Sequence, residues 1–132
     1  MARVKYAIYA ASLALAMILT TLVANQPASA ATWIYSGNMA LGLNLSGRHV
    51  STATVEEYPN PGIPSTLTLH YTGYGKNGVL KGPQKTYTFT CFTIICAHTW
   101  TINFTYAAGD WVFGWGKWSP GTNIPGVPTH GF

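Results

Sequence analysis

The stretch TLTLHYTGY, residues 66–74, alternates apolar and polar side chains over most of its length. Successive side chains of an extended strand point to opposite faces, so Leu67, Leu69 and Tyr71 share one face and the threonines share the other. This period of two is typical of a half-buried β-strand. The Gly-Lys-Asn-Gly sequence that follows at residues 75–78 indicates a turn, because Asn-Gly suits the backbone of tight hairpins.

The same alternation recurs on both sides of this stretch, and no helical periodicity is found after Ala30. Residues 58–64 contain three prolines, which cannot donate to a strand ladder, so a loop is expected there. We therefore predict an all-β fold, a small antiparallel β-sandwich or barrel of six to seven strands. The expected strands are residues 39–46, 49–55, 66–74, 85–92, 97–106 and 111–118, with residues 79–80 as the start of a short return strand.

The first 30 residues have the layout of a secretory signal peptide. Arg3 and Lys5 precede a long uncharged apolar run, and small residues lead up to Ala30, after which cleavage is expected. An uncleaved anchor is the alternative, because the run is nearly long enough to span a bilayer. The predicted organisation is a cleaved signal peptide at residues 1–30, an all-β domain at 31–118 and an irregular Pro- and Gly-rich tail at 119–132. The protein is expected to be secreted, to the extracellular space or the cell surface.

The mature chain of 102 residues carries five lysines and arginines and three acids, a net charge of +2. It contains no basic run, so a nucleic-acid partner is not expected. Its two cysteines, Cys91 and Cys96, are expected to form a disulfide in an exported chain. A lone cysteine pair is too sparse for a structural zinc site, and the histidines lack metal-ligand spacing. We therefore expect no metal and no other cofactor.

The segment Cys91-Phe92-Thr93-Ile94-Ile95-Cys96 is unusually apolar for a turn, where Gly, Asn and Asp are usual. If the flanking strands form a hairpin, this segment is its tip. Phe92, Ile94 and Ile95 are then candidate binding residues for a membrane or a partner protein. The alternative, which we favour, is that the loop folds over one end of the domain and covers it, because exposed apolar groups usually find local cover.

The strand expected at residues 111–118 is strongly aromatic. Trp111, Phe113 and Trp115 alternate onto one face, where they could stack on the apolar faces of sugar rings. We favour the interpretation that these three are core residues, because aromatic side chains dominate core energetics. Trp118, on the opposite face, and Trp33 are better candidates for exposed binding residues.

Threonines on three expected strands would form a regular hydroxyl array if those strands are neighbours. Such an array could order water, as ice-binding surfaces do, or bind a glycan. We favour a structural role, because threonine has a high β propensity and threonine pairs stabilise solvated sheet faces. The threonines concerned are Thr66, Thr68, Thr72, Thr86, Thr88, Thr90, Thr99, Thr101 and Thr105.

Catalytic groups are scarce in this sequence. Glu56 and Glu57 are adjacent, so a strand would point them to opposite faces, and a glycosidase would need one of them to face Asp110 across a cleft. A weak hydrolase is therefore the least supported interpretation, and we assign no catalytic residue. The leading hypothesis is a secreted non-enzymatic binding protein that recognises carbohydrate, a cell-surface protein or a membrane surface through exposed aromatics. The alternative is a small secreted toxin or antimicrobial that contacts membranes through the apolar tip.

Overall fold

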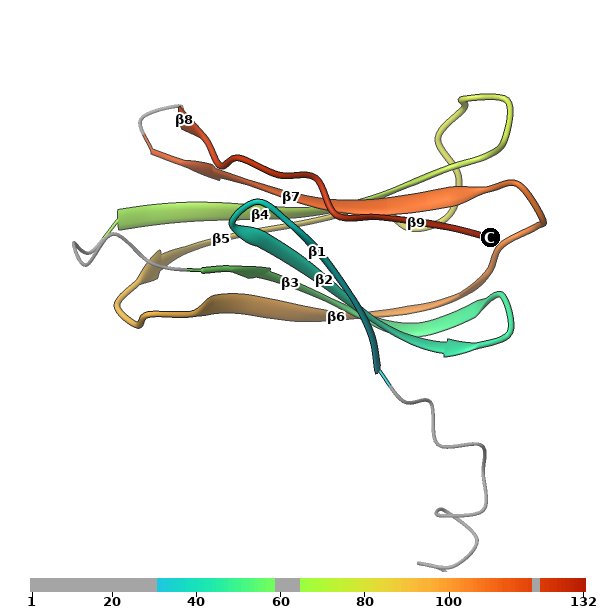
Figure 1. Cartoon of the computed structure of the whole chain (residues 1–132), viewed down its shortest axis with the longest axis horizontal. Coiled ribbons are helices and arrows are strands. Elements are labelled where there is room, and N and C mark those ends of the chain that lie inside the picture. Colours follow the sequence, from blue (N-terminus) through green and yellow to red (C-terminus); the bar gives the residue numbers. More distant parts are fainter. Residues whose placement is uncertain (1–30, 59–64, 120–121) are drawn as a thin grey trace, which may run out of the picture.

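A computed structural model describes residues 31–58, 65–119 and 122–132, which form two antiparallel β-sheets in two layers, with no helix in this part of the chain (Figure 1). Within the same residues, no helix is long and apolar enough to cross a membrane. The expected signal peptide lies outside the described residues. The strands are β1 (Ala31–Ser36), β2 (Met39–Ser46), β3 (His49–Glu57), β4 (Ser65–Tyr74), β5 (Lys85–Cys91), β6 (Cys96–Thr105), β7 (Trp111–Trp118), β8 (Thr122–Asn123) and β9 (Thr129–Gly131).

The first sheet has the strand order β1-β2-β3-β6. Two-residue turns join β1 to β2 and β2 to β3, and each begins with a glycine at positive φ, Gly37 at 55° and Gly47 at 61°. A glycine in that conformation suits the tight turns whose twist matches that of the flanking strands. The last strand, β6, joins from a distant part of the sequence and pairs antiparallel with β3.

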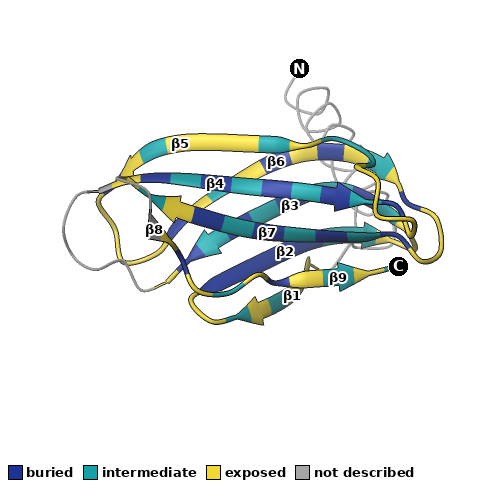
Figure 2. Cartoon of the chain, turned by 90° about the horizontal axis from the view of Figure 1, so that it is seen from above, coloured by how far each residue is buried: buried dark blue, intermediate teal, exposed yellow. Residues whose placement is uncertain are grey.

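The second sheet has the strand order β5-β4-β7, with the short strands β8 and β9 both paired to β7. The deciding stretch at residues 66–74 lies in β4, at the centre of this sheet, where it pairs with β5 and β7. Its predicted core face is confirmed, because Leu67, Leu69 and Tyr71 are fully buried. Figure 2 shows burial alternating along β4 and β7 as these strands lie side by side.

The inner faces of the two sheets share one hydrophobic core. Leu41 and Val55 of the first sheet lie against Gly114 of β7, and Met39 lies against Gly116. The core extends to Tyr71 and Tyr106, which are both buried and whose hydroxyls share a hydrogen bond of 2.8 Å between the sheets. This bond satisfies two polar groups that would be costly to bury alone.

The prediction of an all-β antiparallel fold is confirmed, but the described residues form nine strands rather than six to seven. The additional strands are short or at an edge: β1 is half-exposed, and β8 and β9 have two and three residues. The tail predicted to be irregular therefore supplies two short strands that extend the second sheet. Pro125 and Pro128, which lie between β8 and β9, supply no backbone donor, which helps to keep these strands short. Leu80 of the expected return strand makes only an isolated bridge to Tyr74.

The strands that flank the two cysteines do not form a hairpin. β5 is an edge strand of the second sheet and β6 is an edge strand of the first, so the segment between them crosses from one layer to the other. Cys91 and Cys96 are bonded at this crossing, with their Cα atoms 6.0 Å apart, a usual separation for a disulfide. The disulfide therefore ties the edges of the two sheets together at one end of the molecule.

Candidate functional site

The two faces of β7 carry opposite kinds of side chain. Val112, Gly114 and Gly116 are buried against the first sheet, whereas Trp111, Phe113 and Trp115 are half-buried and lie on the outer face. The interpretation that these three aromatics are core residues is wrong. The reason lies in the alternating glycines, because a Cβ atom at Gly114 would lie 2.9 Å from Cγ2 of Val55. The facing sheet approaches β7 too closely for a larger side chain there, so the large side chains occupy the other face.

The outward rings of β7 stack on side chains of the neighbouring strand β4. The Tyr74 ring lies 5.5 Å from Trp111 and 5.8 Å from Phe113, at interplanar angles of 20° and 12°. The His70 imidazole lies flat on Trp115, with ring centroids 3.6 Å apart. These contacts follow from the strand register, which places Tyr74 opposite Trp111 and His70 opposite Trp115. The result is a row of five rings across the outer face of the second sheet.

A groove of about 330 Å³ runs along this row, between β7 and the returning tail. Its walls combine three aromatic rings with the polar side chains of two other residues and with apolar side chains of the tail. A concave, mostly apolar site with a few polar groups is the usual form of a small-molecule site. We call it the aromatic groove; it is lined by Thr72, Tyr74, Phe113, Trp115, Gly116, Asn123, Ile124 and Val127.

The charge at one end of the aromatic groove is positive. Lys117 is exposed and lies two residues after Trp115, paired in register with Thr68 on one side and Asn123 on the other. Burial lowers the pKa of His70, and the Lys117 ammonium lowers it further. His70 is therefore neutral at pH 7, and each of its ring nitrogens can take part in hydrogen bonding; Nδ1 is 3.1 Å from the Thr86 hydroxyl.

The two tryptophans predicted as exposed binding residues lie elsewhere. Trp33 is exposed on the outer face of the first sheet, where it lies over Gly42 and stacks with Tyr35. Trp118 is half-buried and packs against the core, so its predicted exposure is wrong. Register places Trp118 beside Leu67, on the inner face of the sheet. The structure does not bring the two tryptophans together.

The apolar loop between the cysteines is open to solvent. Phe92 is 75% exposed, Ile94 68% and Ile95 51%. The favoured interpretation, that this loop covers an end of the domain, is therefore wrong, because the loop spans the two layers instead of folding over them. A hollow of about 380 Å³ lies beside Ile95 and is lined also by Tyr35 and other residues of that end.

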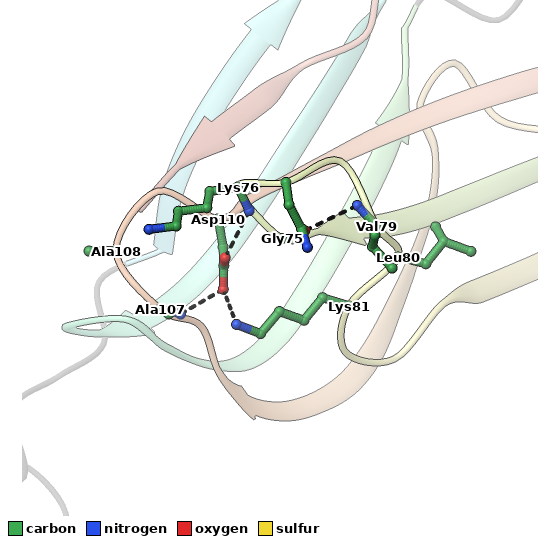
Figure 3. Close-up of a pocket in the computed structure, with 9 residues that line it drawn as sticks. Gly75, Lys76, Val79, Leu80, Lys81, Ala107, Ala108 and Asp110 are labelled. Atoms are coloured by element: carbon green, nitrogen blue, oxygen red, sulfur yellow. Dashed lines mark hydrogen bonds and ion pairs between the residues drawn. The ribbon is translucent and has the colours of Figure 1, made fainter.

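Asp110 serves as a latch between two loops (Figure 3). One carboxylate oxygen accepts hydrogen bonds from the Ala107 backbone N–H at 2.7 Å and from the Lys81 ammonium at 2.6 Å, and the other accepts from the Lys76 backbone N–H at 3.2 Å. The hydrogen bond from Lys81 lowers the pKa of Asp110, and that from Ala107 lowers it further. A hollow of about 400 Å³ adjoins this latch. Two of the charged residues that line the hollow, Lys81 and Asp110, are paired with each other.

The structure does not bring the acids together as a hydrolytic pair. Glu57 pairs in register with Met39, whose side chain reaches Gly116, whereas Asp110 precedes the start of β7. Asp110 and Gly116 are six positions apart along the chain, which corresponds to about 20 Å of extended strand. Glycosidase carboxylates lie about 5 to 9.5 Å apart. Within the described residues, no group of three or more potential metal ligands occurs.

Glu57 has an environment that the sequence did not signal. It is the last residue of β3, only 2% of its side chain is exposed, and its Oε2 has no hydrogen-bond partner. Burial raises its pKa to about 7. The alternation along β3 places Glu57 on the same inner face as Val55. From the sequence alone, however, an acidic residue at that position indicates the solvated end of a strand.

The threonine arrays pair across strands. Thr68 and Thr88 share a hydrogen bond of 2.9 Å, and Thr54 and Thr99 share one of 2.7 Å. Hydroxyls that bond to one another stabilise a solvated sheet face, which supports the structural interpretation.

No protein-family model matches the chain, and no curated protein matches it. Among solved structures, the chain is similar to an endonuclease/exonuclease/phosphatase from Beutenbergia cavernae, with a TM-score of 0.48 and 14% sequence identity. The match covers 78% of this chain and 27% of that protein, so the chain spans about a quarter of that protein's length. These values assign neither a family nor an activity to this chain.

Proposed function

We propose that the mature protein is a secreted β-sandwich protein that binds carbohydrate through the aromatic groove, without catalysing a reaction. The observation that carries this proposal is the outward placement of Phe113 and Trp115 beside Thr72 and Asn123. The C–H groups of a pyranose ring form an apolar face that packs on an aromatic ring. The hydroxyls at the ring's edge need hydrogen-bond partners, which a hydroxyl and an amide supply.

Pre-stacked rings favour such binding. Tyr74 contacts both Trp111 and Phe113, and His70 contacts Trp115, so the rings are held before a ligand arrives. Side chains that are already ordered lose less conformational entropy on binding than free ones do. The fixed rings therefore form a platform on a rigid central strand rather than on a loop.

The test is binding of the mature protein to a panel of immobilised polysaccharides, with Phe113→Ala and Trp115→Ala as the site variants. Truncation of an aromatic anchor at the centre of a binding site costs about 2 kcal/mol, about a 30-fold weakening. The matched control is Trp33→Ala, which removes an exposed tryptophan from the opposite face. Loss of binding in the Trp33 variant alone would place the site on the first sheet and refute the aromatic groove.

The non-enzymatic part of the proposal has its own test. Incubation of each bound polysaccharide with the protein should leave its chain length unchanged. Turnover that is abolished by Glu56→Gln or Asp110→Asn would overturn this part of the proposal.

A second candidate function, a toxin or antimicrobial that contacts membranes, is supported by the exposure of Phe92, Ile94 and Ile95 on a disulfide-closed loop. Dye leakage from anionic and neutral vesicles tests it. Leakage should be lost in Ile94→Asp and retained in Val79→Asp, which alters an equally exposed apolar residue on a distant loop. Leakage that survives Ile94→Asp would exclude this loop as the membrane contact.

A further inference from the structure

We propose that the sugar bound in the aromatic groove is anionic, and that the Lys117 ammonium binds its acidic group. This inference rests on the proposed carbohydrate-binding function and specifies the ligand. The shared chemistry is a sugar ring with an apolar face and a negatively charged substituent, either a carboxylate or a sulfate.

The first argument is the position of Lys117. It is exposed on the same face of β7 as Phe113 and Trp115, two residues beyond Trp115. Residues two apart on a strand lie about 6.6 Å from one another, a distance that a substituent of a stacked sugar ring can span. Its register partner on β8 is Asn123, which itself lines the groove.

The second argument is that no acid of this chain compensates the charge of Lys117. The sequence between Ala31 and Phe132 contains three acids, all within the described residues. Asp110 binds Lys81, Glu57 is buried inside the core, and Glu56 lies in β3 of the first sheet. The positive charge of Lys117 beside the aromatic groove is therefore not paired with an acid, whereas the charge of Lys81 is paired with Asp110.

The third argument concerns the imidazole stacked on Trp115. Burial lowers the pKa of His70 and the Lys117 charge lowers it further, so His70 is neutral at pH 7. The charge at this end of the groove comes from Lys117 alone, and the neutral His70 ring stays available for stacking and hydrogen bonding. A single cation beside an apolar platform matches one acidic group on each sugar.

The experiment measures affinity of the mature protein for two matched pairs of polymers. Polygalacturonate and its methyl ester share one backbone and differ in the carboxylate charge, and dextran sulfate and dextran differ in sulfate. The variants are Lys117→Gln, Phe113→Ala and the control Lys76→Gln, which removes an exposed cation from the distant loop at Asp110. We expect one charged polymer to bind more tightly than its neutral counterpart, and Lys117→Gln to weaken that binding about three- to fivefold. Lys76→Gln should leave it unchanged.

The other outcomes separate this inference from the function on which it rests. Equal binding of charged and neutral polymers, sensitive to Phe113→Ala but not to Lys117→Gln, would overturn the anionic ligand and leave carbohydrate binding in place. Equal weakening by Lys117→Gln and Lys76→Gln, with no effect of Phe113→Ala, would show non-specific attraction and overturn both. Absence of binding to any polysaccharide would also overturn both. The pair of polymers that shows the charge effect identifies the acidic group as carboxylate or sulfate.

Discussion

Replacement of Glu57 by glutamine should remove a pH-dependent loss of stability from this protein. Glu57 ends β3 with a carboxyl that is almost fully buried and has one oxygen without a hydrogen-bond partner. In the folded protein, burial raises its pKa from 4.5 to about 7. The neutral acid is therefore the form that the folded protein accommodates, and glutamine is its closest uncharged replacement.

The sign of the effect follows from proton binding. Between pH 4.5 and about 7, the folded protein holds a proton on Glu57 that the unfolded chain has lost, so stability falls as the pH rises through this range. The difference between the pKa of 4.5 and the pKa of about 7 corresponds to an upper limit of about 3 kcal/mol. Glu57 is the last residue of β3, and relaxation of the strand end around the charged form would reduce this value, so we expect about 2 kcal/mol.

Urea unfolding at about pH 4.5 and at about pH 7.5 measures the effect as a difference between wild type and Glu57→Gln. Burial lowers the pKa values of His70, His98 and His130, and these groups act in the opposite direction as the pH falls, but they contribute equally to both proteins and cancel. Glu56→Gln, a change at the adjacent position, is the control and should follow the wild-type profile. Parallel pH profiles for wild type and Glu57→Gln would refute the reasoning.

Three further predictions concern the disulfide, the close approach of the sheets and the latch. Replacing Cys91 and Cys96 together by serine should lower the free energy of unfolding by about 2 kcal/mol, the value for a six-residue ring, and leave the protein folded; a fully unfolded variant, or free thiols in the wild type by mass spectrometry, would contradict this. Gly114→Ala should lower it by about 1–3 kcal/mol in thermal unfolding because the new methyl meets Val55. Gly131→Ala, which meets nothing within 4 Å, should change it by less than about 0.5 kcal/mol, and equal effects at the two glycines would disprove the packing argument. Asp110→Asn should speed amide exchange in the two latched loops. It should also reduce the loss of stability that we expect for the wild type as the pH falls below about 4, the direction set by the lowered pKa of Asp110; an unchanged acid-unfolding profile would argue against the latch.

The sequence predicted β4 because its side chains face two clearly different environments. Leu67 and Leu69 are fully buried, whereas Thr68 and His70 are only half-buried, as the alternation indicated. Edge strands gave weaker signals. Residues 31–36 form β1 with one face in solvent and the other only half-buried, so no contrast between the two faces marks this strand.

The candidate site was harder to predict, because it depends on which face of β7 meets the other sheet. Trp111, Phe113 and Trp115 have far larger apolar side chains than Val112 and Gly114 between them, so the apolar area alone places them inside. Gly114 and Gly116 indicate the opposite orientation, because glycines on the inner face of β7 allow the facing sheet to approach closely. The sequence alone does not show this orientation, because the distance between the sheets is not known from it. The crossing at the cysteines was missed for a similar reason: a short loop between two strands favours a hairpin unless the pairing partners of each strand are known.

The interleaved strand order has a consequence for the order in which the protein can fold. Residues 31–57 supply β1, β2 and β3, but the apolar side of this meander, with Leu41 and Val55, remains uncovered until β4 and β7 exist. β3 pairs with β6, and β4 pairs with β7, across more than 30 intervening residues in each case. Such distant pairings place all-β domains among the slow folders, with refolding times of about milliseconds to seconds. An emerging chain therefore exposes the apolar side of its first three strands until residue 118 has been released, and during that interval a chaperone that covers this surface would protect it from aggregation.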